Sequence, residues 1–334
     1  MNKYSVILPV RNGGEYVKEC VSSILAQSLG DFQLQVLDNC STDGTSDYLQ
    51  SLRDERIKIY PADKPLTIEE NWARITTIPK NEFITLIGHD DVLDTNYLAV
   101  MDRLIQKHPQ AGLYQAHFRY INATGGTIRL CKPMDEVQSP QEFITFFLSG
   151  MIDIMGTGFM MRSVDYDAVG GIPPYPNLLF ADFELWLNLA GKSYKATAFE
   201  ECFSYRIHQG TTTTTADIKY HKAFARFNAF LKQLTDTRPQ YREVIERYAL
   251  RFIHVYCKSL AHRLLRTPTR KRSGLNVKDF VAQCKKDADA VLPGNDYDPY
   301  SHFDVRLAKT IDSNEIFRQA FLLFRKLYSK PVYS

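Results

Sequence analysis

Short apolar runs alternate with amphipathic segments over the first part of the chain. The runs YSVILPV, FQLQVLD, IKIY and EFITLIG are typical of buried β-strands. Between the first two, apolar residues recur at helical spacing at Val17, Cys20, Val21, Ile24 and Leu25. The segment STDGTSDYLQSL predicts a loop leading into a second helix, with Ser41 or Thr42 as its N-cap. This order predicts an open α/β sheet with right-handed crossovers.

The pattern changes along the rest of the chain. DTNYLAVMDRLIQKHP predicts a helix, and AGLYQAHF and MGTGFMMRS predict two more strands. After about residue 215 only helical spacing remains, and no metal or nucleotide motif is present; the segments are KAFARFNAFLKQL, REVIERYALRFIHVYCKSLAHRLL and VKDFVAQCKKDADAVL. We therefore expect an α/β domain over residues 1–215 and a mainly helical domain over residues 216–334.

Composition narrows the class of protein. The 334 residues are 44% apolar and 24% charged, which is ordinary for a globular protein, and a net charge of +3 gives no argument for a nucleic-acid partner. Six scattered cysteines form no C-x-x-C pair, so no zinc ribbon, redox motif or disulfide framework is expected. The N-terminus is too short in apolar residues for a signal peptide, and no apolar run approaches ~18 residues. We expect a cytoplasmic protein.

Polar segments directly follow three of the predicted strands: PVRNGG, LDNCSTDG and GHDD. In open α/β sheets ligands bind beyond the carboxyl ends of the strands. Asp90 and Asp91 are adjacent like charges, and a hard cation such as Mn²⁺ or Mg²⁺ would remove their repulsion. One carboxylate after a strand is more often a turn former, and Asp38 could be one; Arg11 and Asn12 could lie in a plain surface loop. Three such segments in strand order favour a binding site.

These segments also carry a family resemblance. SVILPVRNGGEYVKECVSSILAQS, VLDNCSTDGTSD and ITLIGHDDVLD resemble successive blocks of the inverting family 2 glycosyltransferases. That family has the GT-A fold, an open mixed sheet flanked by helices, with a D-x-D-like metal motif. The resemblance implies that Asp90 is the metal ligand and Asp91 its supporting residue, and that Asp38 contacts the base or ribose. Gly88 stands where the family's first acid is usual.

Two later blocks extend the resemblance over about 215 residues. FADFELWLNLAGK is similar to the family's E-D-x-x-L-W-x-R-L block, and the match implies that Asp182 is the catalytic base, although Ala181 and Asn188 replace the usual Glu and Arg. YRIHQGTTTT is similar to a block whose histidine lies near the diphosphate and metal, which implies that role for His208. The expected nucleotide-site residues are Pro9, Arg11, Asn12, Asp38, Asn71, Asp90 and His208. Asp90, Asp91 and His208 are the expected metal ligands.

The expected function is metal-dependent, inverting glycosyl transfer. Residues 1–95 would bind a nucleotide diphosphate sugar, and residues 96–215 would bind the acceptor. The family resemblance implies a UDP-linked donor, the commonest in that family. The expected acceptor is a hydroxyl of a glycan or lipid-linked glycan, as in bacterial cell-envelope polysaccharide synthesis. Two alternatives stay open: a nucleotidyltransferase acting on sugar phosphates, and a non-catalytic nucleotide- or glycan-binding protein. PVRNGGEYV lacks the Gly-rich basic loop expected of the first alternative.

The C-terminal part is rich in basic and aromatic residues. HRLLRTPTRKR is a basic cluster, and in IFRQAFLLFRKLYSK the aromatic residues Phe317, Phe321, Phe324 and Tyr328 share a face apart from Arg318, Arg325, Lys326 and Lys330. A basic, aromatic helix can lie on an anionic membrane surface, here the inner face of the cell membrane. The alternative is an ordinary helix packed on the catalytic domain or on a second subunit of a homo-oligomer. Both readings stay open at this point.

Overall fold

The computed structural model describes residues 2–208 and 218–328, which form two compact units. The sheet unit comprises Met1–Phe143, Gly150–Pro174 and Ala181–His208. The helical unit comprises Ile144–Ser149, Tyr175–Phe180 and Gln209–Ser334. The expected domain boundary between residues 215 and 216 lies outside the described residues.

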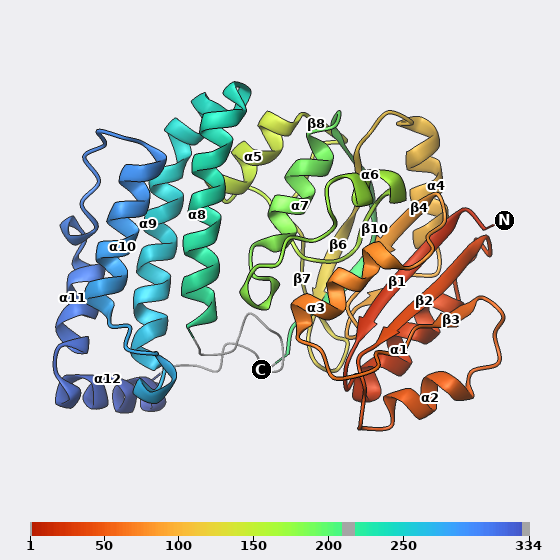
Figure 1. Ribbon diagram of the computed structural model, residues 1–334, viewed down its shortest axis with the longest axis horizontal. Coiled ribbons are helices and arrows are strands. Elements are labelled where there is room, and N and C mark those ends of the chain that lie inside the picture. Colours follow the sequence, from red (N-terminus) through yellow and green to blue (C-terminus); the bar gives the residue numbers. More distant parts are fainter. Residues whose placement is uncertain (1, 209–217, 329–334) are drawn as a thin grey trace. The chain divides into compact units, whose positions relative to one another are not determined.

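A mixed sheet of ten strands forms the core of the sheet unit (Figure 1). Its strand order is β3-β2-β1-β4-β9-β6-β10-β5, with β7 paired to β6 and β8 paired to β10. The strands are Tyr4–Val10 (β1), Phe32–Asp38 (β2), Ile57–Ile59 (β3), Phe83–Leu86 (β4), Val92–Leu93 (β5), Leu113–Ile121 (β6), Thr127–Leu130 (β7), Val137–Gln138 (β8), Phe159–Arg162 (β9) and Lys195–Arg206 (β10).

The strand directions decide where the loops gather. The strands β1, β2, β3 and β4 are mutually parallel, and β9 runs antiparallel between β4 and β6. All seven residues of β1 are buried, as expected of a central strand covered on both faces. Because β6 and β10 also run parallel to each other, the carboxyl ends of β1, β2, β4, β6 and β10 all lie at one edge. The predicted α/β class is confirmed.

Helices flank this sheet and connect its strands. The predicted apolar face of α1 is confirmed, since Val17, Cys20, Val21 and Ile24 are buried. The predicted cap of α2 is wrong, because that helix begins at Thr45 after Gly44, whose φ is 91°. Ser41 instead donates its hydroxyl hydrogen to Asp38. The helices of this part of the chain are Gly14–Leu25 (α1), Thr45–Ser51 (α2), Ile68–Ala73 (α3), the 3₁₀ turn Arg74–Thr77 (η1), Tyr97–Lys107 (α4), Pro140–Ser149 (α5), Ser163–Ala168 (α6) and Ala181–Ala190 (α7).

The helical unit is built mainly from α8, α9 and α10, which contact one another pairwise. Aromatic rings fill its interior; Phe180 stacks on Phe227 with ring centroids 5.2 Å apart, and Phe224 stacks on Tyr256 at 5.3 Å. Within the described residues, no helix has the length and apolar character needed to cross a membrane. The elements are Pro176–Leu178 (η2), Lys219–Thr237 (α8), Pro239–Tyr241 (η4), Arg242–Arg266 (α9), Thr269–Lys271 (η5), Val277–Val291 (α10), Pro299–Ser301 (η6), Phe303–Asp312 (α11) and Glu315–Tyr328 (α12).

Candidate active site

The loops after β1 and β2 are tied together at the carboxyl edge of the sheet. Val10 and Asp38 are paired in the parallel register of β1 and β2, so the loops that follow these two strands leave the sheet side by side. The backbone N–H of Asn12 donates to the Ser41 hydroxyl at 2.9 Å, and its side-chain oxygen accepts from the Thr42 N–H at 2.8 Å. Asn12 has a φ of 53°, a left-handed conformation that asparagine tolerates better than most residues. The two loops therefore form one polar surface.

The residues expected around the nucleotide differ in their exposure and in their hydrogen bonds to the rest of the protein. Asp38 is 3% exposed, and one carboxylate oxygen accepts from the Ser41 hydroxyl at 2.6 Å. Arg11 is exposed, donating to the carbonyl of residue 66 at 3.3 Å, and Pro9 is buried within β1. Asn71 is buried; its amide donates to the Leu37 carbonyl and accepts from Arg74. Both ends of the Asn71 amide thus hold the chain around the end of β2.

Asp90 and His208 are brought together from segments far apart in the sequence. Asp90 lies in the loop after β4 and His208 two residues beyond β10, and His208 Nε2 is 2.8 Å from Asp90 Oδ2. Their side chains are 20% and 17% exposed. Burial raises the pKa of Asp90, but the hydrogen bond with His208 and the charge of His89 outweigh it and hold that pKa below its usual value. Asp90 is therefore held in its anionic form, and its side chain is partly exposed.

Asp91 is held by the protein on both carboxylate oxygens. It is 1% exposed and accepts from the Thr157 hydroxyl at 2.6 Å and from the Arg206 backbone N–H at 3.1 Å. Burial, followed by the charge of Asp90, raises the pKa of Asp91 well above its ordinary value. Its place directly beside Asp90 suits a supporting residue.

Gly88 is required by the same two carboxylates. A Cβ atom at this position would lie 2.8 Å from Asp90 Oδ1 and 3.0 Å from Asp91 Oδ2, closer than van der Waals contact allows. An acid at position 88 would therefore displace both side chains. The departure from the family pattern at Gly88 has this steric explanation.

Arg206 connects the site to three other parts of the sheet unit, and the sequence analysis missed it. The guanidinium is 1% exposed; it donates to the Asp90 carbonyl at 2.8 Å, to the Asn122 carbonyl at 3.2 Å and to the Glu19 carboxylate at 2.6 Å. A buried arginine that ties two loops and helix α1 together fixes the backbone beside Asp90. Its position two residues before His208, within the quoted YRIH block, is the sequence signal that could have found it.

Asp182 lies in the first turn of α7. Its Oδ1 accepts from the Phe183 N–H at 2.9 Å, and burial raises the pKa of the carboxyl to about 6. The indole of Trp186 holds the helix in place, donating to the Met155 carbonyl at 3.0 Å and stacking on Phe159. A helix anchored in this way gives Asp182 a defined position.

The backbone leading into α7 is strained. Asn177, Leu178 and Phe180 have φ values of 54°, 56° and 67°. The left-handed region is costly for a leucine or a phenylalanine, roughly 1–3 kcal/mol each, and such strain collects at functional sites. The loop before Asp182 therefore has an unusual backbone conformation.

Tyr205 relates Asp182 to the other carboxylates. Burial, and then the charges of Asp91, Asp90 and Asp182, raise the pKa of the Tyr205 phenol. The phenol is therefore within electrostatic range of all three acids, so the candidate base and the Asp90–His208 pair belong to one region. Tyr205 is a second residue that the sequence analysis missed, although it too lies in the YRIH block.

The donor set at this edge fits a cation that the substrate helps to bind. Within residues 2–208 and 218–328, no group of three or more His, Cys, Asp or Glu side chains is arranged to hold a metal. Asp90 and His208 alone supply two donor atoms 2.8 Å apart. Two neighbouring ligands of one ion with bonds of ~2.1 Å lie about 3 Å apart, and Mg²⁺ usually takes one or two protein carboxylates with substrate phosphates and water.

The family follows from a match along the first half of the chain. The family model "Glycosyl transferase family 2" matches residues 5–169, which include the loops after β1, β2 and β4. Residues 5–169 are a glycosyl transferase family 2 domain. The expected family and the expected GT-A fold are confirmed, and glycosyl transfer is the supported chemistry.

Curated relatives are identical to this chain at about a quarter of the aligned positions. An uncharacterised glycosyltransferase of Rickettsia typhi is 24% identical over 69% of this chain and 72% of its own length. TuaG of Bacillus subtilis, named as a proposed teichuronic acid biosynthesis glycosyltransferase, is 27% identical over 61% of this chain and 78% of its own length. Both matches support a glycosyltransferase.

Solved structures extend the likeness over nearly the whole chain. S. aureus TarS residues 1–349, solved in complex with UDP-GlcNAc, align with a TM-score of 0.62 at 14% identity, covering 99% of this chain and 95% of that one. The mannosyltransferase PcManGT of Pyrobaculum calidifontis, in complex with GDP-Man and Mn²⁺, aligns with a TM-score of 0.54 at 13% identity, covering 98% and 88%. At these identities the likeness shows the fold.

Proposed function

We propose that the chain moves a sugar, with inversion, from a nucleotide diphosphate sugar to a hydroxyl of a glycan or lipid-linked glycan. One observation carries this proposal: a carboxylate–histidine pair lies at the carboxyl edge of a family 2 sheet, and the same unit holds a partly buried carboxyl of raised pKa. A single displacement requires two groups. One binds the leaving diphosphate through a cation, and the other is a base that accepts the proton of the acceptor hydroxyl.

Asp182 is the proposed base. The acceptor hydroxyl is a weak nucleophile at neutral pH, so a carboxylate that accepts its proton during attack accelerates transfer by ~10²–10⁴-fold. A pKa of about 6 keeps Asp182 mostly ionised at neutral pH while making it a stronger base than an ordinary aspartate. Attack on the face opposite the diphosphate inverts the anomeric centre.

The donor side is assigned to the loops after β1, β2 and β4. Asp38 has a carboxylate oxygen beyond the one that Ser41 occupies, and it accepts from the base or ribose. Exposed Arg11 and the Asn12 loop border the diphosphate, and buried Pro9 and Asn71 shape the pocket wall. Asp90 and His208 would hold Mn²⁺ or Mg²⁺, with Asp91 in support; such an ion neutralises the charge that develops on the departing diphosphate.

The similar proteins support the choice of donor and acceptor class. The solved complexes of TarS with UDP-GlcNAc and of PcManGT with GDP-Man and Mn²⁺ favour a nucleotide sugar and a divalent cation here. The name of TuaG favours an acceptor that belongs to a bacterial surface glycan. The six cysteines are all free, which suits a reducing compartment, and we propose a cytoplasmic setting for the reaction.

The test measures nucleoside diphosphate release from a panel of nucleotide sugars, with Mn²⁺, with Mg²⁺ and with a chelator. We expect one donor to give cation-dependent release that Asp182→Asn abolishes and Glu184→Gln preserves. Conversion of a nucleotide sugar and added pyrophosphate into a nucleoside triphosphate and a sugar 1-phosphate would establish the nucleotidyltransferase alternative. Binding of nucleotide sugars with no turnover in the presence of glycan acceptors would establish the non-catalytic one.

A further inference from the structure

The helix α12 displays an apolar stripe to its surroundings. Ile316 is 76% exposed, Leu323 59% and Leu327 68%, and Phe317 and Phe324 are also more than half exposed. At 100° per residue, positions 316, 320, 323 and 327 fall on one side of the helix, with 317 and 324 beside them. A surface helix of a globular protein ordinarily turns such a stripe inward.

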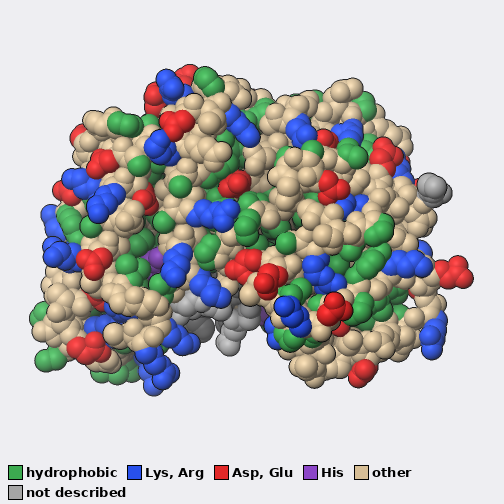
Figure 2. Space-filling view, in the orientation of Figure 1, with side chains coloured by type: hydrophobic (Ala, Val, Ile, Leu, Met, Phe, Trp, Pro, Cys, Tyr) green, Lys and Arg blue, Asp and Glu red, His purple; other side chains and the backbone are tan. Residues whose placement is uncertain are grey.

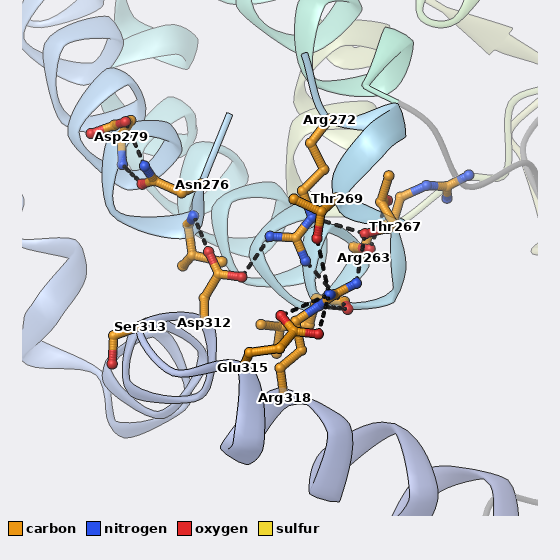
Figure 3. Close-up of polar contacts among 12 residues, drawn as sticks. Arg263, Thr267, Thr269, Arg272, Asn276, Asp279, Asp312, Ser313, Glu315 and Arg318 are labelled. Atoms are coloured by element: carbon orange, nitrogen blue, oxygen red, sulfur yellow. Dashed lines mark hydrogen bonds and ion pairs between the residues drawn. The ribbon is translucent and has the colours of Figure 1, made fainter. Parts of the chain in front are cut away.

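The opposite side of α12 is anchored through a buried arginine (Figure 3). Arg318 is 6% exposed; it donates to the Leu265 carbonyl at 3.1 Å and to the Thr267 carbonyl at 3.0 Å, at the end of α9. Arg272 donates to the same Thr267 carbonyl at 2.8 Å. These bonds fix the rotation of α12, so its charged residue points inward and its apolar stripe points outward. The sequence analysis placed Arg318 off the aromatic face of this helix but did not predict its burial.

The cations around α12 outnumber the acids that could neutralise them. Asp312 pairs with Arg272 at 2.6 Å, and Glu315 pairs with Arg318 at 3.2 Å, so both nearby acids are already engaged. No ion pair to a described residue is formed by the remaining cations, which are Arg266, Arg270, Lys271, Arg325 and Lys326. Four of them are exposed and Arg325 is partly exposed. Figure 2 shows hydrophobic and basic atoms side by side at the lower edge of the helical unit, where Figure 1 places α12.

We propose that α12 is an interfacial helix that binds the surface of an anionic lipid bilayer. An outward apolar stripe beside unpaired cations is the pattern of helices that lie in the headgroup region, with ~5–10 Å of burial. The helix has 14 residues, too few for the ~20 that spanning needs, so it lies on the membrane. This inference goes beyond the proposed reaction and does not depend on it.

A second copy of the chain is the less favoured occupant of this surface. A two-fold interface centred on α12 would bring each patch against its own equivalent. The cations Arg266, Arg270 and Lys326 of one copy would then face those of the other with both acids already paired, and like charges oppose association. An anionic lipid surface has the complementary charge.

Flotation of the full chain with vesicles tests the proposal. We expect binding to phosphatidylglycerol-containing vesicles, weaker binding to pure phosphatidylcholine, and partial release at high salt, because screening weakens only the electrostatic part. Leu323→Gln/Leu327→Gln should lower partitioning into vesicles at least about tenfold, since each change removes an apolar side chain that would be buried in the bilayer. The matched control is Val164→Gln, which alters a 69% exposed valine on α6 of the sheet unit and should leave partitioning unchanged.

Two further variants separate insertion from simple charge attraction. Leu323→Trp should show blue-shifted emission that brominated lipids quench, because an interfacial indole lies at the depth of the bromines. Lys326→Glu/Arg270→Glu should abolish the preference for anionic vesicles. Equal partitioning of the Leu323→Gln/Leu327→Gln protein and the wild type would overturn the proposal. So would an absence of vesicle binding together with a dimer in light scattering that the same double variant converts to monomer, because the stripe would then serve a second copy.

Discussion

Each unit buries arginine side chains against backbone carbonyls, but the balance of charge around them differs. In the helical unit Arg272 and Arg318 are matched one for one by Asp312 and Glu315. In the sheet unit Arg206 pairs with Glu19. Asp90 and Asp91 lie beside its backbone, and among the described residues of this unit no second buried arginine pairs with them.

This difference separates a structural cluster from a functional one. The balanced cluster closes the end of α9 and holds α11 and α12. In the sheet unit, burial raises the pKa of Asp182 and, together with the charge of Asp90, that of Asp91. A surplus of carboxylates with shifted pKa values is costly unless a cation or a proton transfer uses it. We infer that the surplus marks the proposed site of substrate and cation.

The largest expected effect is on turnover. Asp182→Asn keeps the shape of the side chain and removes its basicity, so kcat should fall by ~10²–10⁴-fold while donor affinity is retained. Product formation by the purified variant measures this effect. Glu184→Gln, on the same turn of α7, is the control and should be far milder. Near wild-type turnover of the Asp182 variant would remove the proposed base.

Breaking the balanced cluster should affect stability alone. Arg272→Met leaves Asp312 buried without its partner, and the free energy of unfolding should fall by about 3–5 kcal/mol, with kcat per folded molecule unchanged. Denaturant unfolding followed by circular dichroism measures the loss. The double variant Arg272→Met/Asp312→Leu should recover much of it, because no uncompensated charge stays buried. A change in kcat of the folded single variant would show that the two clusters are not separate in function.

The pH profile should report the raised pKa of Asp182. A base acts when deprotonated, so kcat/KM should rise with pH through about 6, the pKa of this carboxyl. At one unit below that pKa the rate should be about tenfold under its plateau. The measurement is initial rate against pH at low substrate concentration. A flat profile across this range would be inconsistent with Asp182 as the titrating base.

The smallest effect concerns the stability of the same variant. The pKa of Asp182 is about 6 in the folded protein, above the ~3.9 of an unfolded chain. The folded state therefore binds more protons between these values, and this group lowers stability as pH rises from about 4 to 6. Asp182→Asn should be more stable than the wild type by about 1–2 kcal/mol at pH 7.5, with the difference vanishing near pH 4. Thermal unfolding at both pH values tests this; a variant less stable at pH 7.5 contradicts it.

The strands and the positions of the polar loops could be read from the sequence because both depend on local pattern. β1 spans the residues of the run YSVILPV, and Asp38 follows Val36 and Leu37 at a strand end as expected. The cap of α2 could not be predicted, because Ser41 bonds to Asp38 at the end of β2 and Thr42 bonds to Asn12 in the loop after β1. Helix α11 was missed, since its residues Phe303 and Leu307 are exposed and leave a weak apolar period.

The candidate site was predicted as a set of residues, but its contacts depend on tertiary structure. Spacing placed Asp90 and His208 in separate motifs, 118 residues apart, and only the fold brings them to 2.8 Å. Arg206 was passed over because its role lies in backbone carbonyls that no side-chain pattern records. The burial of Arg318 was not predicted for the same reason, since its partners are the carbonyls that end α9.

The most direct test of the proposed site at Asp90 and His208 is calorimetric titration of UDP and GDP into the protein, with Mn²⁺ and with a chelator. We expect Mn²⁺ to strengthen binding of one nucleoside diphosphate at least about tenfold, because the ion would be coordinated by the diphosphate together with Asp90 and His208. Asp90→Asn should lose this gain, whereas Asp47→Asn, on exposed α2, should keep it. An Mn²⁺-dependent gain that is undiminished in Asp90→Asn, or absent from the wild type with both nucleotides, would contradict the account.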